Sequence, residues 1–90
     1  MLERESGPSG WAEIGGSRYR IEGWEIFEGD EASPHMCRGW FRYQAHEFPA
    51  TTGMVVQLEL VTDEGKVRPL TAHLQTARTT APEWEFRAER

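Results

Sequence analysis

Short stretches in which polar and apolar residues alternate recur along this chain, and this period of two is typical of strands with one buried face. The pattern is clearest from Met54 to Thr62, where the apolar residues share one face: Met54, Val56, Leu58 and Leu60. Residues 63–65, Asp-Glu-Gly, predict a hairpin turn because Gly65 can adopt a positive φ. The segment therefore predicts a strand and a turn of an antiparallel sheet.

Three further segments carry the same signal, at residues 17–27, 36–45 and 83–88. In the first, the phase slips at Gly23, and a β-bulge there would bring the large apolar residues to one side: Tyr19, Ile21, Trp24 and Ile26. In the second, one face carries Cys37, Phe41 and Tyr43, and the other carries Arg38, Trp40, Arg42 and Gln44. In the third, we expect the aromatic residues to point inward: Trp84 and Phe86.

Residues 66–76 fit two interpretations. A strand would align Leu70, Ala72 and Leu74 on one face, whereas a helix would align Leu70, His73, Leu74 and Ala77. Pro69 suits the first turn of a helix or an edge strand, and the preceding hairpin turn favours a strand. We expect the strand, with a short helix over 69–78 as the alternative.

Together these segments predict a mainly β fold: a single small antiparallel β domain of about five strands, arranged as a curled sheet or a small barrel. A chain of 90 residues has room for one domain. We expect that domain at 17–90, with polar loops at residues 28–35, 46–53 and 77–82. Residues 1–16 contain Gly-Pro-Ser-Gly and Gly-Gly and predict a flexible N-terminal tail, unless Trp11 holds them against the core as an edge strand.

Composition narrows the function classes. The formal net charge is −5, and acids outnumber bases in both halves of the chain, which argues against broad binding to nucleic-acid backbones. The chain has no apolar run that could span a membrane, no apolar core of a secretory signal and one cysteine, so we expect a cytoplasmic protein without a disulfide. Nine arginines, one lysine and no asparagine indicate a GC-rich genome, that of a bacterium or of a bacteriophage.

Few side chains could hold a metal or act as a nucleophile. Structural zinc usually takes four nitrogen or sulfur ligands, and the candidates lack a Cys-x-x-Cys pair: His35, Cys37, His46 and His73. Cys37 with His35 as its base would be a thiol nucleophile, but no other motif of a catalytic site accompanies the pair. We therefore expect no enzyme, no metal site and no cofactor.

The stretch 38–43, Arg-Gly-Trp-Phe-Arg-Tyr, interleaves basic and aromatic residues on one predicted strand. Arg38, Trp40 and Arg42 would share a face able to stack bases and hold phosphates, and Arg18 and Arg20 could extend it from the preceding strand. These arginines could equally pair with glutamates of neighbouring strands and cover Trp40 with their aliphatic stems.

An acidic segment precedes this stretch, with five carboxylates and no basic residue: Glu22, Glu25, Glu28, Asp30 and Glu31. Such a surface steers a domain towards a basic partner, for example a protein that binds nucleic acid, or simply keeps the domain soluble. We expect the acidic segment to set the orientation of a docked partner.

The functional expectation is a non-enzymatic binding module that docks on another protein as a regulator or inhibitor. Trp40 or Trp24 would be its aromatic anchor, since binding energy concentrates in such residues. Single-stranded nucleic acid is the alternative ligand, held by Arg38, Trp40 and Arg42. An exposed edge strand, such as the one that contains Pro69, would also permit self-association.

Overall fold

The computed structural model describes residues 3–30, 33–44, 48–78 and 81–89, and for residues 3, 28–30 and 33–35 it describes the backbone alone. In this part of the chain there are seven strands and no helix: β1 (Glu3–Gly7), β2 (Ser9–Ile14), β3 (Ser17–Asp30), β4 (Ser33–Tyr43), β5 (Val55–Val61), β6 (Val67–Ala77) and β7 (Glu83–Glu89). None of the described residues belongs to a helix able to cross a membrane. The predicted mainly β fold is confirmed, and residues 69–78 belong to a strand over most of their length.

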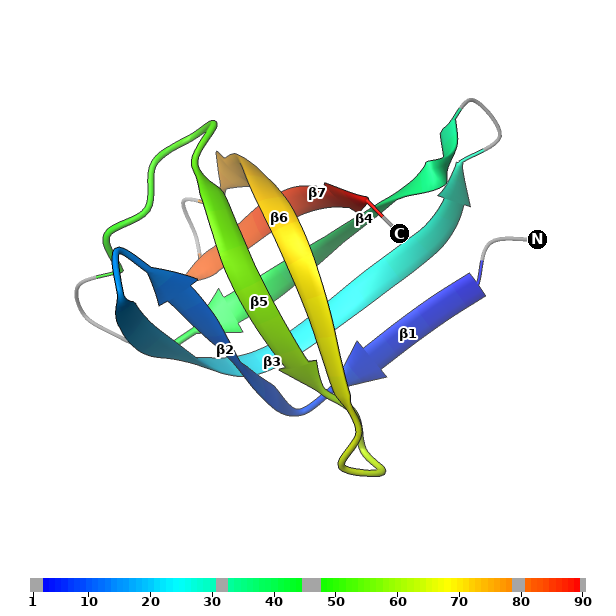
Figure 1. Cartoon of the computed structure of the whole chain (residues 1–90), viewed down its shortest axis with the longest axis horizontal. Helices are drawn as coiled ribbons and strands as arrows, with labels where there is room; N and C mark the ends of the chain where they lie inside the picture. Colours follow the sequence, from blue (N-terminus) through cyan, green and yellow to red (C-terminus); the bar gives the residue numbers. More distant parts are fainter. Residues whose placement is uncertain (1–2, 31–32, 45–47, 79–80, 90) are drawn as a thin grey trace.

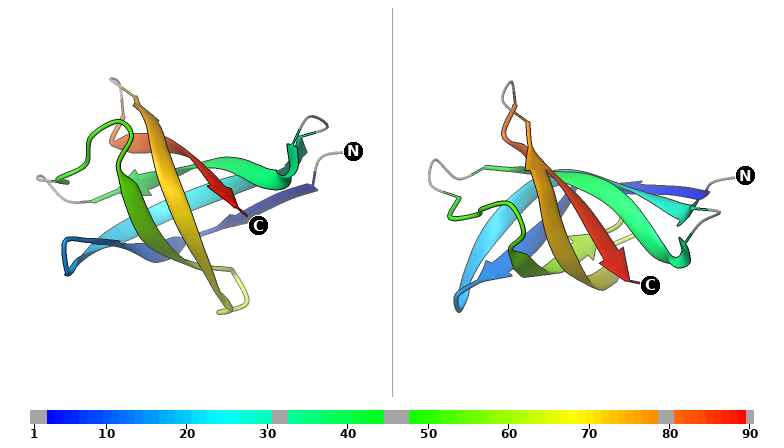
Figure 2. Two further views of the ribbon diagram at one scale, coloured as in Figure 1. Left: turned by 45° about the horizontal axis from the view of Figure 1, so that its top comes forward. Right: turned by 90° about the horizontal axis from the view of Figure 1, so that it is seen from above.

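The strands form two antiparallel meanders, β2–β3–β4 and β5–β6–β7 (Figure 1). Two further antiparallel pairings, β2 with β5 and β4 with β7, join the meanders into a closed ring of six strands among the described residues. The predicted small barrel is therefore confirmed. β1 stands outside the ring and runs along β3, beside the long β3–β4 hairpin that projects away from β5 and β6 (Figure 2).

The core lies inside this ring and consists of the apolar face of each strand. Its largest fully buried side chains are aromatic: Trp24, Phe41 and Phe86. A ring of six strands is narrow, so small residues are needed where strands approach each other. A Cβ atom on Gly39 would lie 2.3 Å from the carbonyl oxygen of Glu25, and one on Gly7 would lie 2.3 Å from that of Val61. Glycine is the residue that fits at both positions.

The β-bulge predicted at Gly23 is confirmed. The register between β3 and β4 shifts between Ile21 and Gly23, and Ile21, Trp24 and Ile26 are all buried. The shift directs the Trp24 ring into the barrel, where its indole N–H donates to the carbonyl oxygen of Ser9 at 2.9 Å and to that of Val61 at 3.2 Å. Trp24 therefore connects β3 to two other strands.

The flexible tail predicted for residues 1–16 is wrong for residues 3–7 and 9–14. These residues form β1 and β2, which lie end to end along β3 on either side of Pro8. Because β2 also pairs with β5, Trp11 lies in a strand with a neighbour on each side and not in an edge strand. The glycines that suggested flexibility instead serve the close packing of strands and the turn at Gly15 and Gly16, both with positive φ.

The loop predicted for residues 28–35 is also shorter in the structure, since β3 continues to Asp30 and β4 begins at Ser33. Pairing of β3 with β4 supports this extension and β1 adds a second neighbour at Glu28, although the local composition favours a turn. Pro69 lies in the part of β6 that pairs with β5, and β7 pairs only from Ala72 onward. Among the described strands, no second neighbour requires the missing N–H of Pro69.

Candidate functional site

The predicted basic and aromatic residues of β4 lie on the outside of the barrel, between β3 and β7. Arg38 has Phe27 of β3 opposite it on one side and Arg87 of β7 opposite it on the other. We refer to Phe27, Arg38 and Arg87 as the arginine row. Both arginine side chains are exposed, and the Phe27 side chain is half-buried.

A second row follows two residues further along β4. Trp40 is half-buried and has Glu25 of β3 and Glu85 of β7 opposite it. We refer to these three residues as the tryptophan row. Since side chains two residues apart on a strand share a face, at a spacing of about 6.8 Å, the two rows are neighbours on one surface.

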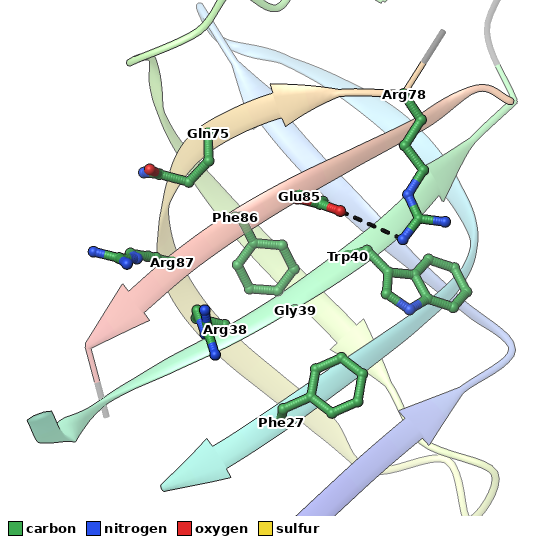
Figure 3. A pocket seen from close by; sticks show the side chains of 9 residues that line it. All are labelled: Phe27, Arg38, Gly39, Trp40, Gln75, Arg78, Glu85, Phe86 and Arg87. Atoms are coloured by element: carbon green, nitrogen blue, oxygen red, sulfur yellow. Dashed lines mark hydrogen bonds and ion pairs between the residues drawn. The ribbon is translucent and has the colours of Figure 1, made fainter. Parts of the chain in front are cut away.

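An open groove of about 480 Å³ lies over the arginine row and over Trp40 and Glu85 of the tryptophan row (Figure 3). Residues of β3, β4 and β7 and the end of β6 with the residue after it line the groove: Phe27, Arg38, Gly39, Trp40, Gln75, Arg78, Glu85, Phe86 and Arg87. Three of these side chains are arginines and one is a carboxylate. The groove therefore carries positive charge on a protein whose net charge is −5.

Most charged groups around the groove already have a partner. Arg78 lies 3.4 Å from a carboxylate oxygen of Glu85, within the groove, and 3.3 Å from one of Glu83 beyond it. Glu83, whose side chain is 7% exposed, also pairs with Arg42 at 2.9 Å. These contacts connect β4, β7 and the end of β6 and hold the rim of the groove in place.

On the other side of the groove, Arg4 of β1 pairs with Glu25 at 3.5 Å. The same guanidinium lies over the ring of Phe27, with its central carbon 5.0 Å from the ring centroid. Both carboxylates of the tryptophan row, Glu25 and Glu85, are thus neutralised by an arginine from outside that row.

Arg38 and Arg87 differ from these residues. Within the described part of the chain, neither guanidinium forms an ion pair or a side-chain hydrogen bond with a carboxylate. The two residues nevertheless stand directly opposite each other on antiparallel strands. Like charges in this arrangement repel, so the pair does not stabilise the folded state.

The structure places the predicted site residues in different environments. Trp24 belongs to the core with 1% exposure, which corrects its expected role as a surface anchor. Trp40 and Arg38 line the groove, whereas Arg42 lies beyond the groove in its ion pair with Glu83. Glu25 belongs to the tryptophan row.

The rest of the acidic segment contributes less to the described surface. Glu22 is exposed beside the bulge. Only the backbone of Glu28 and Asp30 is described, and Glu31 lies outside the described residues. Arg18 does not extend the basic surface of β4, because it pairs with Glu59 of β5 at 2.7 Å and lies over the ring of Trp11.

Sequence reasoning missed five lining residues: Phe27, Gln75, Arg78, Glu85 and Arg87. Arg87 alternates with the inward residues of the last predicted strand, which marks it as outward-facing but does not reveal its neighbour. The position of Arg87 opposite Arg38 follows from the pairing of β4 with β7, strands far apart in the sequence.

The residues considered for metal binding or thiol chemistry are not brought together within the described part of the chain. Cys37 is 1% exposed and lies in the core, beneath the arginine row. The His35 side chain is not described, and His46 lies outside the described residues. No group of three His, Cys, Asp or Glu side chains able to hold a metal is found in the part of the chain that the structure describes.

Comparison of the chain with protein-family models, with curated proteins and with solved structures finds no match. The groove itself is therefore the basis for inferring a function.

Proposed function

We propose that this protein is a non-enzymatic binding module that docks on another protein through the groove of β3, β4 and β7. The observation that carries the proposal is the position of Trp40, a half-buried ring on the outside of the barrel. It lies two residues along β4 from the arginine row, whose two guanidiniums have no carboxylate partner among the described residues. Tryptophan and arginine are among the residue types that most often dominate the energy of protein interfaces.

The scaffold supports such a role. Trp40 and Arg38 stand on a strand paired on both sides, and Arg78, Glu83 and Glu85 stabilise the adjoining surface by ion pairs. A rigid surface loses little conformational entropy when it binds. By covering part of its partner, a domain of this size would act as a regulator or inhibitor.

The test compares two tryptophans on different faces. Trp40→Ala removes the proposed anchor, and Trp11→Ala is the matched control because Trp11 is 38% exposed and lies on β2, away from the groove. Tagged wild-type protein and both variants are used for affinity capture from a bacterial lysate treated with nuclease, after circular dichroism has established that each variant is folded. We expect Trp40→Ala to lose a protein that the wild type and Trp11→Ala retain. Equal retention by a folded Trp40→Ala variant would refute the proposal.

Single-stranded nucleic acid is a second candidate, favoured by one observation. Phe27 and Trp40 are partly accessible rings on neighbouring strands, next to Arg38, which has no ion pair within the described residues, and such rings can stack with bases. This function predicts that a single-stranded oligonucleotide quenches the fluorescence of Trp40 at low salt and that the effect weakens steeply as salt is added. Unchanged fluorescence at low salt would exclude this candidate.

A further inference from the structure

We propose that Arg38 and Arg87 form a carboxylate-binding clamp, and that the segment of the partner that docks in the groove is an extended acidic peptide with an apolar residue two positions from the acid. This inference rests on the docking function proposed above and names the chemistry of the partner.

The charge of the arginine row favours an anionic ligand. Arg38 and Arg87 are directly opposite in the register of β4 and β7, and neither is neutralised within the described residues. The nearby carboxylates are engaged elsewhere, Glu25 with Arg4 and Glu85 with Arg78. A ligand carboxylate between the two guanidiniums would replace repulsion with attraction, and the planar guanidinium is well suited to bind carboxylate oxygens.

The surface changes from basic in the arginine row to aromatic in the tryptophan row, which favours a ligand with one acid next to one apolar side chain. The tryptophan row presents an aromatic ring between two carboxylates that are already paired, so its side chains need no further charge. In an extended peptide that lies along β4, side chains two residues apart face the same way and are about 6.8 Å apart. An acid on Arg38 and Arg87 therefore places an apolar side chain on Trp40.

The same pattern disfavours a nucleic-acid strand in this groove. A nucleic acid carries a negative charge at every nucleotide, whereas the groove arginines that lack a carboxylate partner among the described residues occupy one row. A strand that continued along β4 would bring its next phosphate to the row that contains Glu25 and Glu85. The net charge of −5 adds to this repulsion at low salt. One localised acid matches the groove better than a continuous polyanion.

The test uses three fluorescein-labelled probes. The first is an eight-residue serine-rich peptide in which one glutamate and one leucine are separated by a single serine, the second has glutamine in place of the glutamate, and the third is single-stranded oligothymidine. Binding is followed by fluorescence anisotropy and by the NMR signals of the arginine Nε–H groups and the tryptophan indole N–H groups. We expect the acidic peptide to bind more tightly than its glutamine counterpart and to shift the signals of Arg38, Arg87 and Trp40.

The variants are Arg38→Gln and Arg87→Gln, with Arg20→Gln as the control, since Arg20 is also exposed and has no ion pair in the described residues but stands on β3 outside the groove. Each clamp substitution is expected to weaken binding of the acidic peptide about fivefold to tenfold, and the control to leave it unchanged. Absence of any shift at Arg38 and Arg87, equal binding of the two peptides, or tighter binding of oligothymidine would overturn the clamp.

The outcomes separate the two proposals. If the partner captured by wild type is lost with Trp40→Ala but kept with Arg38→Gln and Arg87→Gln, the docking function stands and the clamp is wrong. If all three variants lose the partner and the control variants keep it, the clamp contributes to docking. If folded Trp40→Ala keeps the partner, the docking function fails at this groove, and the clamp, which rests on it, fails too.

Discussion

Gly39 is a buried residue of β4 that lies between Arg38 and Trp40 and lines the proposed binding groove. A Cβ atom at this position would lie 2.3 Å from the carbonyl oxygen of Glu25 and 2.8 Å from Cζ of Phe86. Favourable contacts between carbon atoms lie at about 3.5–4.0 Å, so both neighbours would have to move. The oxygen belongs to the backbone of β3, and the Phe86 ring is fully buried, so neither can move without cost.

We therefore expect Gly39→Ala to lower the free energy of unfolding by about 2–3 kcal/mol. Inserting a methyl group into a packed core costs about 1–3 kcal/mol, and displacement of strand backbone places this substitution towards the upper end. A gain of a few tenths of a kcal/mol, up to about 1, arises because alanine restricts the unfolded chain, and it reduces the net effect. For a domain of this size the loss corresponds to a decrease in melting temperature of about 10–20 °C.

Gly23→Ala is the matched control. It adds the same methyl group to the neighbouring strand, but the nearest atom to its Cβ would be the carbonyl oxygen of Gly7 at 3.9 Å, an ordinary contact. Thermal melts followed by circular dichroism, with urea titrations to establish that the m-value is unchanged, should place Gly23→Ala within a few degrees of wild type. If Gly39→Ala melts together with the control, the close approach of β3, β4 and Phe86 is refuted.

Two further substitutions test the charges around the groove. Glu83→Gln keeps the shape of a buried side chain but weakens its contacts with Arg42 and Arg78. We therefore expect the free energy of unfolding, measured by urea titration, to fall by about 1–3 kcal/mol. An unchanged free energy of unfolding would contradict a stabilising role for this carboxylate. Arg87→Gln removes a like charge opposite Arg38, so the melting temperature of this variant at low salt should equal or exceed that of wild type. A clear decrease would show that Arg87 stabilises the fold and is not kept for binding a ligand.

Much of the fold is predictable from local patterns. All five segments with an alternating pattern are strands, and the phase slip at Gly23 is a bulge. These features follow from the two-residue period of a strand, which depends on neighbouring residues in the chain. The same period correctly placed Arg38, Trp40 and Arg42 on the outer face of β4.

Prediction was less successful where pairing with a distant strand outweighs local composition. Residues 3–14 contain the glycines and the proline of a flexible segment, yet β3 and β5 provide partners that order them as β1 and β2. The same applies to residues 28–30, which continue β3 because Glu28 and Asp30 pair with β4 and Glu28 also pairs with β1. Hydrogen bonds to distant strands cannot be predicted from local composition.

For the candidate site, too, some features follow from the sequence and others from the tertiary structure. The alternating sequence by itself determined the β class, the bulge at Gly23 and the outward direction of Arg38 and Trp40, since each depends only on which residues are adjacent in the chain. Only the tertiary structure decided that Trp24 is buried, that Arg4 and Arg78 neutralise Glu25 and Glu85, and that Arg87 stands opposite Arg38. The physical reason is that these contacts depend on strand order and register, which closure of the barrel sets through pairings between residues far apart in the chain.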